Sequence, residues 1–305
     1  MLLFYEHDTG SGELAQVERP SGSIPAYIFS AGLTRRDTTL LEQEFGLAGH
    51  LLSDVFDVNE LPRLDQDDGT RYVFLRSAEL RGDKIHSQPI LFATRKDLFV
   101  CIATGKQATN GVIDGVLTHQ LSPESLQTHS IYAILKQYEA LVDKVGTHIT
   151  EIENRMRSHE VTNEDFYRFV SIESSLSWSR MNLISMRAVV ERLMETSKHK
   201  ADLELLDDAR LFASQLLVEI EGHVQLITSV RNAYGTIANN TLNQRMKLLT
   251  ALTLLLALPN VFYGMYGMNV ELPFMHEPWA YFAIVGFTIT LMVSIFAIAK
   301  RQRFF

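Results

Sequence analysis

The chain contains no lysine or arginine between Leu248 and Ala299. Two apolar runs lie in this stretch, at residues 248–268 and 279–299. Each has about 20 residues, the length that an α-helix needs to cross a hydrocarbon core about 30 Å thick. A buried helix of a soluble protein is the alternative, but two neighbouring runs followed by a basic tail favour membrane spans. We therefore expect residues 248–305 to form a transmembrane region in a lipid bilayer.

The charges that flank the two runs predict the orientation. Arg245 and Lys247 precede the first run, and three basic residues follow the second. The loop 269–278 between them contains Glu271 and Glu277 and no basic residue. Because cytoplasmic flanks carry the excess of basic residues, both termini are expected in the cytoplasm, and the protein in the cytoplasmic (inner) membrane. The N-terminus lacks the features of a signal peptide.

Composition excludes several classes of function. The 28 basic and 36 acidic residues give a net charge of −8, which argues against nucleic acid as a partner. The single cysteine, Cys101, excludes a disulfide framework and a zinc site made of several thiolates. It lies in the apolar run 98–102, so we expect a reduced core residue. No phosphate-binding loop, dinucleotide fingerprint, zinc-protease motif or nucleophile–base set is found, so the sequence does not indicate an enzyme.

Residues 1–121 are predicted to form a cytoplasmic α/β domain. Short runs rich in β-branched and aromatic residues predict strands at 26–29, 71–76, 89–93 and 98–102. Helices are expected at 37–45, 50–56 and 111–120, and the Gly10-Ser11-Gly12 segment is expected to form a hairpin turn. The fold class expected for this part is therefore α+β.

Residues 122–247 are predicted to form a cytoplasmic helical stalk. Ser122 is a suitable N-cap with Pro123 at the first helical position, and apolar residues recur at three- and four-residue steps from 131 to 156. A polar patch at 158–165 separates this helix from a second one that ends near Thr196. A third helix begins near Ala201 and shows no stop signal before the membrane. At 1.5 Å per residue it would extend about 100 Å, so it must pack against other helices or copies of itself.

A seam of small and polar residues runs along the first membrane run and the helix before it. At steps of three or four residues it contains Asn243, Met246, Thr250, Thr253, Ala257, Asn260, Gly264 and Gly267. The spacing averages about 3.5 residues, which keeps one helix face toward a common axis. Tight helix packing would explain the small residues. It explains Asn260 poorly, because an amide in lipid needs a hydrogen-bonding partner. We favour a water-lined axis.

Two spans cannot enclose a channel, so a pore along this seam requires several identical chains around one axis. Asn269 at the outer end would then form a ring of neutral amide oxygens. Such a ring suits Mg²⁺, which gives up its water reluctantly and can be held through its hydration shell. Glu271 and Glu277 would attract cations to the mouth, or are simply solvated loop charges.

Residues Asn243, 246–250, Pro259 and Tyr266-Gly267-Met268-Asn269 resemble the CorA family of divalent-cation channels. The Gly-Met-Asn triplet between two C-terminal spans is specific to that superfamily. The resemblance implies a funnel-shaped homopentamer with a central pore and with Gly267, Met268 and Asn269 as the selectivity filter. It also implies Mg²⁺ as the transported and regulatory ion, with Co²⁺ or Ni²⁺ sometimes carried.

The resemblance extends to a regulatory site. Leu52-Ser53-Asp54-Val55-Phe56 is similar to a family segment that contributes an acidic residue to an intersubunit Mg²⁺ sensor. This implies Asp54 as one ligand, and ungapped extension from the triplet implies Asp208 as its partner. Bound Mg²⁺ would bridge the two carboxylates and hold the subunits closed. Either aspartate can also be read as a solvated surface residue, and Ser53 stands where the family often has Glu.

Two departures from the family pattern bear on the position of the gate. Ala257 occupies the position of a bulky gate residue, and Pro259 is one residue nearer to the triplet, so Met246 and Leu249 are the better gate candidates. Relatives of the ZntB type, which move Zn²⁺ or other transition metals, usually have Ile where Met268 stands, which favours Mg²⁺.

The alternative from another class of function is a membrane-anchored metal sensor that does not conduct ions.

Overall fold

The computed structural model describes residues 1–7, 14–22, 25–30, 32–82, 84–105, 121–157, 163–268 and 276–301. The chain divides into two units, Met1–Ser229 and Val230–Phe305, and each is considered by itself. The expected helix at 111–120, the Gly10-Ser11-Gly12 turn and most of the polar patch at 158–165 lie outside the described residues.

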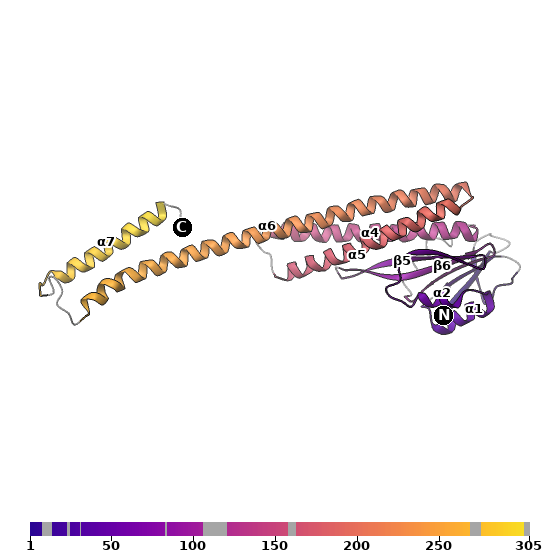
Figure 1. The fold of residues 1–305 in the computed structure, drawn as a ribbon, viewed down its shortest axis with the longest axis horizontal. Helices are drawn as coiled ribbons and strands as arrows, with labels where there is room; N and C mark the ends of the chain where they lie inside the picture. The colour runs from indigo at the N-terminus through magenta and orange to yellow at the C-terminus, as the bar shows by residue number, and fades with distance from the viewer. Residues whose placement is uncertain are drawn as a thin grey trace. The chain divides into compact units, whose positions relative to one another are not determined.

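The first unit contains a seven-stranded sheet in the order β2-β1-β3-β7-β6-β5-β4 (Figure 1). Its strands are β1 Leu2–His7, β2 Leu14–Val17, β3 Ala26–Ser30, β4 Arg63–Asp67, β5 Thr70–Arg81, β6 Lys84–Arg95 and β7 Leu98–Ala103. Neighbouring strands pair antiparallel except β3 and β7, which run parallel. The four predicted strands correspond to β3, β5, β6 and β7. The sequence did not predict the outer strands β1, β2 and β4.

Two short helices cover one face of the sheet (Figure 1). They are α1 Arg35–Phe45 and α2 Gly49–Asp54. Helix α1 begins at a capping box formed by Thr34 and Asp37 and ends at Gly46, whose left-handed backbone (φ 70°) suits a residue without a Cβ. Leu41 and Leu52 pack against alternate residues of β5, β6 and β7, and form the core on this side.

Long helices cover the opposite face. They are α4 Pro123–Arg157 and α5 Asn163–Thr196. Helix α6 Lys200–Tyr266, of which residues up to Ser229 belong to this unit, packs on α4, where the ring centroids of Tyr132 and Phe212 are 5.9 Å apart. Helix α4 contacts β5, β6 and β7, whereas α5 contacts β4, β5 and β6. The predicted cap of α4 is present, because the Ser125 amide donates to Ser122 Oγ at 3.2 Å. Because both faces are covered, β3 and β7 are buried along their whole length, Cys101 included.

The second unit contains the remainder of α6 and helix α7 Ala280–Arg301. Helix α6 has 67 residues and continues through Pro259 without a break, as the sequence predicted. Among the described residues, α6 and α7 are the two helices long and apolar enough to span a membrane. The α/β domain, the long helices and the two candidate spans are thus confirmed. The domain limits at 121/122 and 247/248 stay predictions.

Candidate functional site

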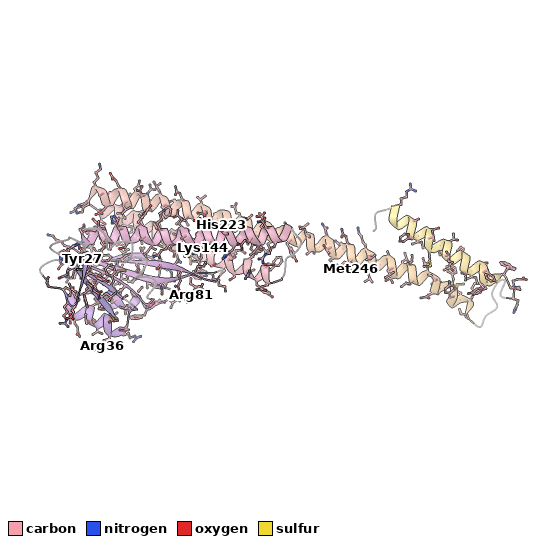
Figure 2. All side chains as sticks on the ribbon, turned by 180° about the vertical axis from the view of Figure 1, so that it is seen from behind. Tyr27, Arg36, Arg81, Lys144, His223 and Met246 are labelled. Carbon is pink, nitrogen blue, oxygen red and sulfur yellow. The ribbon has the colours of Figure 1, made fainter. Side chains whose placement is uncertain are left out.

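The seam predicted on α6 is exposed at every position that the structure describes. Met246, labelled in Figure 2, is 53% exposed, and Leu249 is 58% exposed. The other exposed members are Asn243, Thr250, Thr253, Ala257, Asn260, Gly264 and Gly267. Within the described part of one chain, therefore, no other element covers this face.

A different face of α6 contacts α7. The half-buried residues of the span are Ala251, Leu255, Leu258, Pro259, Phe262 and Tyr266. The Phe262 ring lies edge-on against the Phe287 ring of α7, with 5.3 Å between the centroids. At about 100° per residue, this face is about half a turn away from the seam. Helix α7 thus lies against one side of α6, at Phe262, and not against the polar side.

The two seam hydroxyls are hydrogen-bonded within the helix. Thr250 Oγ1 donates to the Met246 carbonyl and Thr253 Oγ1 donates to the Leu249 carbonyl, each at 2.8 Å. Each hydroxyl proton is therefore used, and the lone pairs of the oxygen remain available as acceptors. An acceptor-rich surface of this kind can receive hydrogen bonds from water, including water bound to a cation.

The segment that follows α6 is described only as far as Met268. The Gly267 amide donates to the Tyr263 carbonyl at 3.0 Å, and the Met268 amide donates to the Met265 carbonyl at 3.2 Å. Asn269 and Glu271 lie outside the described residues. Glu277 is exposed, and its carbonyl accepts the Ala280 amide at the start of α7.

Asp54, one of the two predicted regulatory carboxylates, forms an ion pair. Its Oδ2 lies 2.7 Å from Arg63 Nη2. The same guanidinium contacts the Glu60 carboxylate through Nη1 and Asp65 Oδ2 through Nε, the latter at 2.7 Å. Its central carbon lies 4.1 Å from the centroid of the Phe74 ring. Arg63 therefore places a positive charge against the carboxylate at which the family resemblance implies a Mg²⁺ ion.

Asp208, the other predicted carboxylate, is exposed on α6. Helix α2, which carries Asp54, lies on the opposite side of the sheet from α6 (Figure 1). One chain therefore does not bring the two aspartates together, as expected if the ligands come from different subunits. Among the described residues there is no group of three or more histidine, cysteine, aspartate or glutamate side chains placed to hold a metal ion.

Arg76 is a buried cation to which the sequence assigned no role. Its Nη1 donates to the carbonyls of Val58 (2.9 Å) and Glu60 (2.7 Å), and its Nη2 to the carbonyl of Ser87 (2.9 Å). Asn182 of α5 donates to Ser87 Oγ at 3.0 Å. Burial lowers the pKa of the Arg76 guanidinium. Arg76 thus fixes the loop after Asp54 to β6 and, through Ser87, to α5. In the sequence, the signal that could have identified Arg76 was a charged residue within an otherwise apolar strand.

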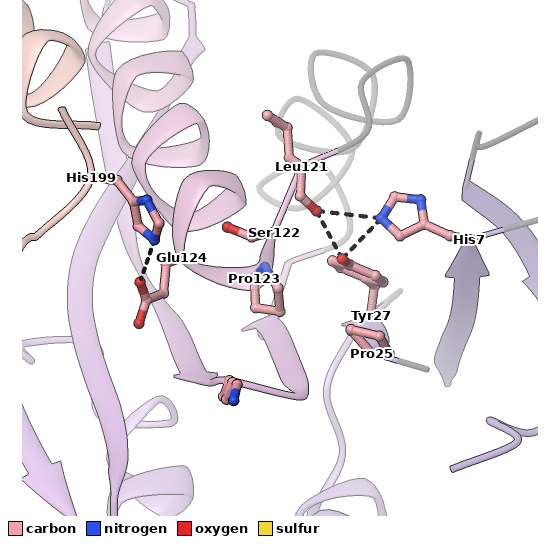
Figure 3. Close-up of a pocket in the computed structure, with 9 residues that line it drawn as sticks. His7, Pro25, Tyr27, Leu121, Ser122, Pro123, Glu124 and His199 are labelled. Carbon is pink, nitrogen blue, oxygen red and sulfur yellow. Dashed lines mark hydrogen bonds and ion pairs between the residues drawn. The ribbon is translucent and has the colours of Figure 1, made fainter. Parts of the chain in front are cut away.

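A cavity of about 780 Å³ lies where β1 and β3 meet the start of α4 (Figure 3). Tyr27 Oη donates to the Leu121 carbonyl at 2.8 Å and lies 3.0 Å from His7 Nε2. Burial raises the pKa of Tyr27 to about 12. His199 lies 4.0 Å from Glu124 at the other side of the cavity. None of these residues belongs to the predicted sites, and no motif spacing in the sequence links them.

The chain is similar in sequence to known metal-ion transport proteins. The chain is 21% identical over 273 residues to the cobalt/magnesium transport protein CorA of Methanocaldococcus jannaschii, and the match covers 86% of each of the two chains. It is 22% identical over 295 residues to the CorA protein of Thermotoga maritima, covering 90% of this chain and 82% of that one. YfjQ of Bacillus subtilis is 25% identical over 273 residues, covering 85% and 83%.

Solved structures show the same fold. The complete CorA magnesium transporter of M. jannaschii superimposes with a TM-score of 0.86 at 18% identity, covering 99% of this chain and 98% of that one. The ZntB cytoplasmic domain of Vibrio parahaemolyticus gives a TM-score of 0.63 at 10% identity, covering 78% and 98%.

The family model described as "CorA-like Mg2+ transporter protein" matches residues 28–301, which is most of the chain. Proteins of this family are ion transporters rather than enzymes, and the two candidate spans agree with a place in the membrane. The chain therefore belongs to the CorA family of divalent-cation transporters.

Proposed function

We propose that five copies of this chain form a funnel-shaped channel that conducts hydrated Mg²⁺ into the cytoplasm. Residues 1–121 and 122–247 form its cytoplasmic domain and stalk, and residues 248–305 its membrane region. The multi-pass chain lies in the cytoplasmic membrane with both termini inside. The name of the M. jannaschii relative, a cobalt/magnesium transport protein, supports this choice of ion.

The observation that carries the proposal is the contrast between two faces of α6. Leu258 and Phe262 lie on the face that α7 covers, and Asn260 and Gly264 lie on the opposite, exposed face. An exposed amide in a lipid-facing position is costly, because no water is available to bond it. Symmetric copies that turn this face toward a common, water-filled axis remove that cost.

The seam and the outer mouth suit a cation that keeps its water. Asn269 would contribute a ring of amide oxygens, and the Thr250 and Thr253 hydroxyls have lone pairs free to accept hydrogen bonds from an aquo ion. A doubly charged ion that moves inward gains about 4.6 kcal/mol per 100 mV of membrane potential, twice the value for one charge. Glu271 and Glu277 raise the cation concentration at the mouth.

Gating is assigned to two further sets of residues. Met246 and Leu249 are exposed on the seam side, and five copies of each would form apolar rings that close the axis by excluding water. Asp54 and Asp208, from adjacent subunits, would bind cytoplasmic Mg²⁺ and favour the closed state.

The test is Mg²⁺ influx into liposomes that contain the purified protein, with an inward potential. The wild-type chain is expected to conduct, and Asn269→Ala is expected to lose uptake at least about tenfold, as for a lost pore ligand group. Asn240→Ala is the matched control, because this exposed amide of the same helix lies before the membrane run and is not among the residues assigned to the pore. Unchanged uptake and selectivity in Asn269→Ala would contradict the filter assignment.

Two further measurements decide stoichiometry and ion. The mass of the detergent-solubilised complex is expected to correspond to five chains, and a monomer would contradict the shared pore. Competition of Zn²⁺ against Mg²⁺ in the same flux assay separates a magnesium channel from a transporter of the ZntB kind. A protein that conducts no ion under any condition would instead act as a membrane-anchored metal sensor.

A further inference from the structure

Arg63 is placed as a permanent cation within a ring of carboxylates. Three acidic side chains contact its guanidinium, those of Asp54, Glu60 and Asp65. They come from the end of α2, from the loop that follows it and from β4, so three successive segments of the chain converge on one positive charge. This convergence is more specific than a single surface ion pair, which contributes little by itself.

The position of the Arg63 guanidinium is also fixed by its contact with the Phe74 ring on the neighbouring strand β5. Arg63 on β4 is directly opposite Phe74 on β5 in the strand register, and the Phe74 ring lies under the guanidinium at 4.1 Å. Phe74 is fully buried, so this support is rigid. The Arg63 side chain is 31% exposed and that of Asp54 is 39% exposed, which leaves the pair reachable by an ion from solvent. A cation over an aromatic face is favourable and holds the side chain in place.

The ion pair has a consequence for the regulatory site proposed above. A divalent cation at Asp54 must share the carboxylate with Arg63 or displace it, because Oδ2 is already bonded at 2.7 Å. Because a Mg²⁺ ion and the Arg63 guanidinium repel each other at short distance, binding of the ion at Asp54 is favoured only when the guanidinium moves away. We propose that Arg63 acts as a resident counter-cation that competes with Mg²⁺ at Asp54, so that this chain responds only to higher Mg²⁺ concentrations than it would without Arg63.

This inference rests on the proposed regulatory role of Asp54, and its test does not depend on conduction. The full-length protein in detergent is titrated with MgCl₂, and its resistance to chymotrypsin is followed. The Mg²⁺ concentration at half-protection is expected to be about tenfold lower in Arg63→Gln than in the wild type, as expected for removing one competing charge pair. Arg63→Lys keeps the charge, and its midpoint is expected to stay within about threefold of the wild type.

Two further variants make the result specific. Arg95→Gln is the matched control, because Arg95 also pairs with an aspartate at 2.7 Å and is 34% exposed, but it is the last residue of β6 and pairs with Asp97 rather than Asp54. Its midpoint is expected to equal that of the wild type. Combining Asp54→Asn with Arg63→Gln is expected to abolish the decrease in the Mg²⁺ concentration at half-protection. Melting temperatures without Mg²⁺ show whether each variant is folded.

The outcomes separate this inference from the proposed function. Three results would overturn the competition by Arg63. They are an unchanged Mg²⁺ midpoint in Arg63→Gln, a lowered midpoint that persists in the double variant, and no protection by Mg²⁺ in the wild type or in Arg63→Gln. Liposome flux is measured on the same samples. Intact Mg²⁺ flux with an unchanged midpoint overturns only this inference, whereas a shifted midpoint in a protein that conducts no ion overturns only the channel.

Discussion

The sheet and the membrane-facing part of α6 are both apolar, but only the sheet is covered by its own chain. Strands β3 and β7 are buried at every position, because helices lie on both faces. In the candidate span of α6, by contrast, Leu252, Leu254 and Leu256 are each more than half exposed. The first region completes its core within one chain, whereas the second leaves its apolar surface exposed within one chain.

The two regions also satisfy their polar groups differently. In the sheet region, Arg76 on β5 binds the carbonyls of Val58, Glu60 and Ser87, which lie more than ten positions away in the sequence. In the spans, Thr250, Thr253 and Thr288 donate to carbonyls four residues earlier in the same helix. Long-range contacts therefore hold the sheet region together, while the spans are locally self-sufficient and leave their outer faces for other molecules.

The largest expected effect tests whether the sheet core is closed within one chain. Phe92→Ala removes a fully buried ring that lies 5.8 Å from the Phe99 ring between centroids. The free energy of unfolding is expected to fall by about 3–5 kcal/mol, as for other large-to-small core changes. Pulse proteolysis of the full-length protein in increasing urea measures it.

Val261→Ala on α6 provides the comparison in the second region. Val261 is 56% exposed, so the same measurement is expected to change by no more than about 0.5 kcal/mol. Equal losses in the two variants would show that the contrast between the regions is wrong.

A second prediction concerns which face of α6 meets water in the membrane. Asn260→Cys in liposomes is expected to react with a water-soluble thiol reagent at least about tenfold faster than Leu258→Cys, because the reactive thiolate forms only where water is present. Leu258 is half-buried on the α7 side, whereas Asn260 is on the exposed seam.

The native chain is a suitable background for this comparison. Its single cysteine, Cys101, is fully buried, and burial raises the pKa of its thiol. The unmodified protein is therefore expected to give little labelling. Similar rates for Asn260→Cys and Leu258→Cys would argue against a water-filled axis along the seam.

The smallest expected effect concerns packing between α4 and α6 in the first unit. A Cβ added to Gly146 of α4 would lie 2.7 Å from Cε1 of His223 on α6, whereas a Cβ added to Gly222 would meet nothing within 4 Å. Gly222→Ala is expected to raise stability by about 0.5–1 kcal/mol through helix propensity. Gly146→Ala is expected to be at least about 1 kcal/mol less stable than Gly222→Ala, because His223 must move. Urea midpoints of the two variants measure the difference, and equal midpoints would show that α4 and α6 are loosely packed here.

Local patterns in the sequence determined the helices and the family. The three- and four-residue steps predicted α4 and α6, Ser122 predicted the start of α4, and the apolar runs predicted both candidate spans. The Gly-Met-Asn triplet led to the CorA family, which the comparisons confirm. These features depend on neighbours within about one helical turn or on composition, so the chain carries them without reference to its fold.

The tertiary structure alone decided the outer strands and the partners of each charge. Strand β4 (Arg-Leu-Asp-Gln-Asp) has no clear apolar alternation, and it is a strand because β5 pairs with it. Likewise, β3 pairs with β7 about 70 positions later, which no local pattern specifies. Asp54 was predictable as a charged residue, but its pairing with Arg63 depends on the pairing of β4 with β5, which places Arg63 over Phe74. The orientation of the seam relative to α7 is likewise set by the contact between the two helices. Such contacts are set by the energy of the whole fold rather than by any short segment.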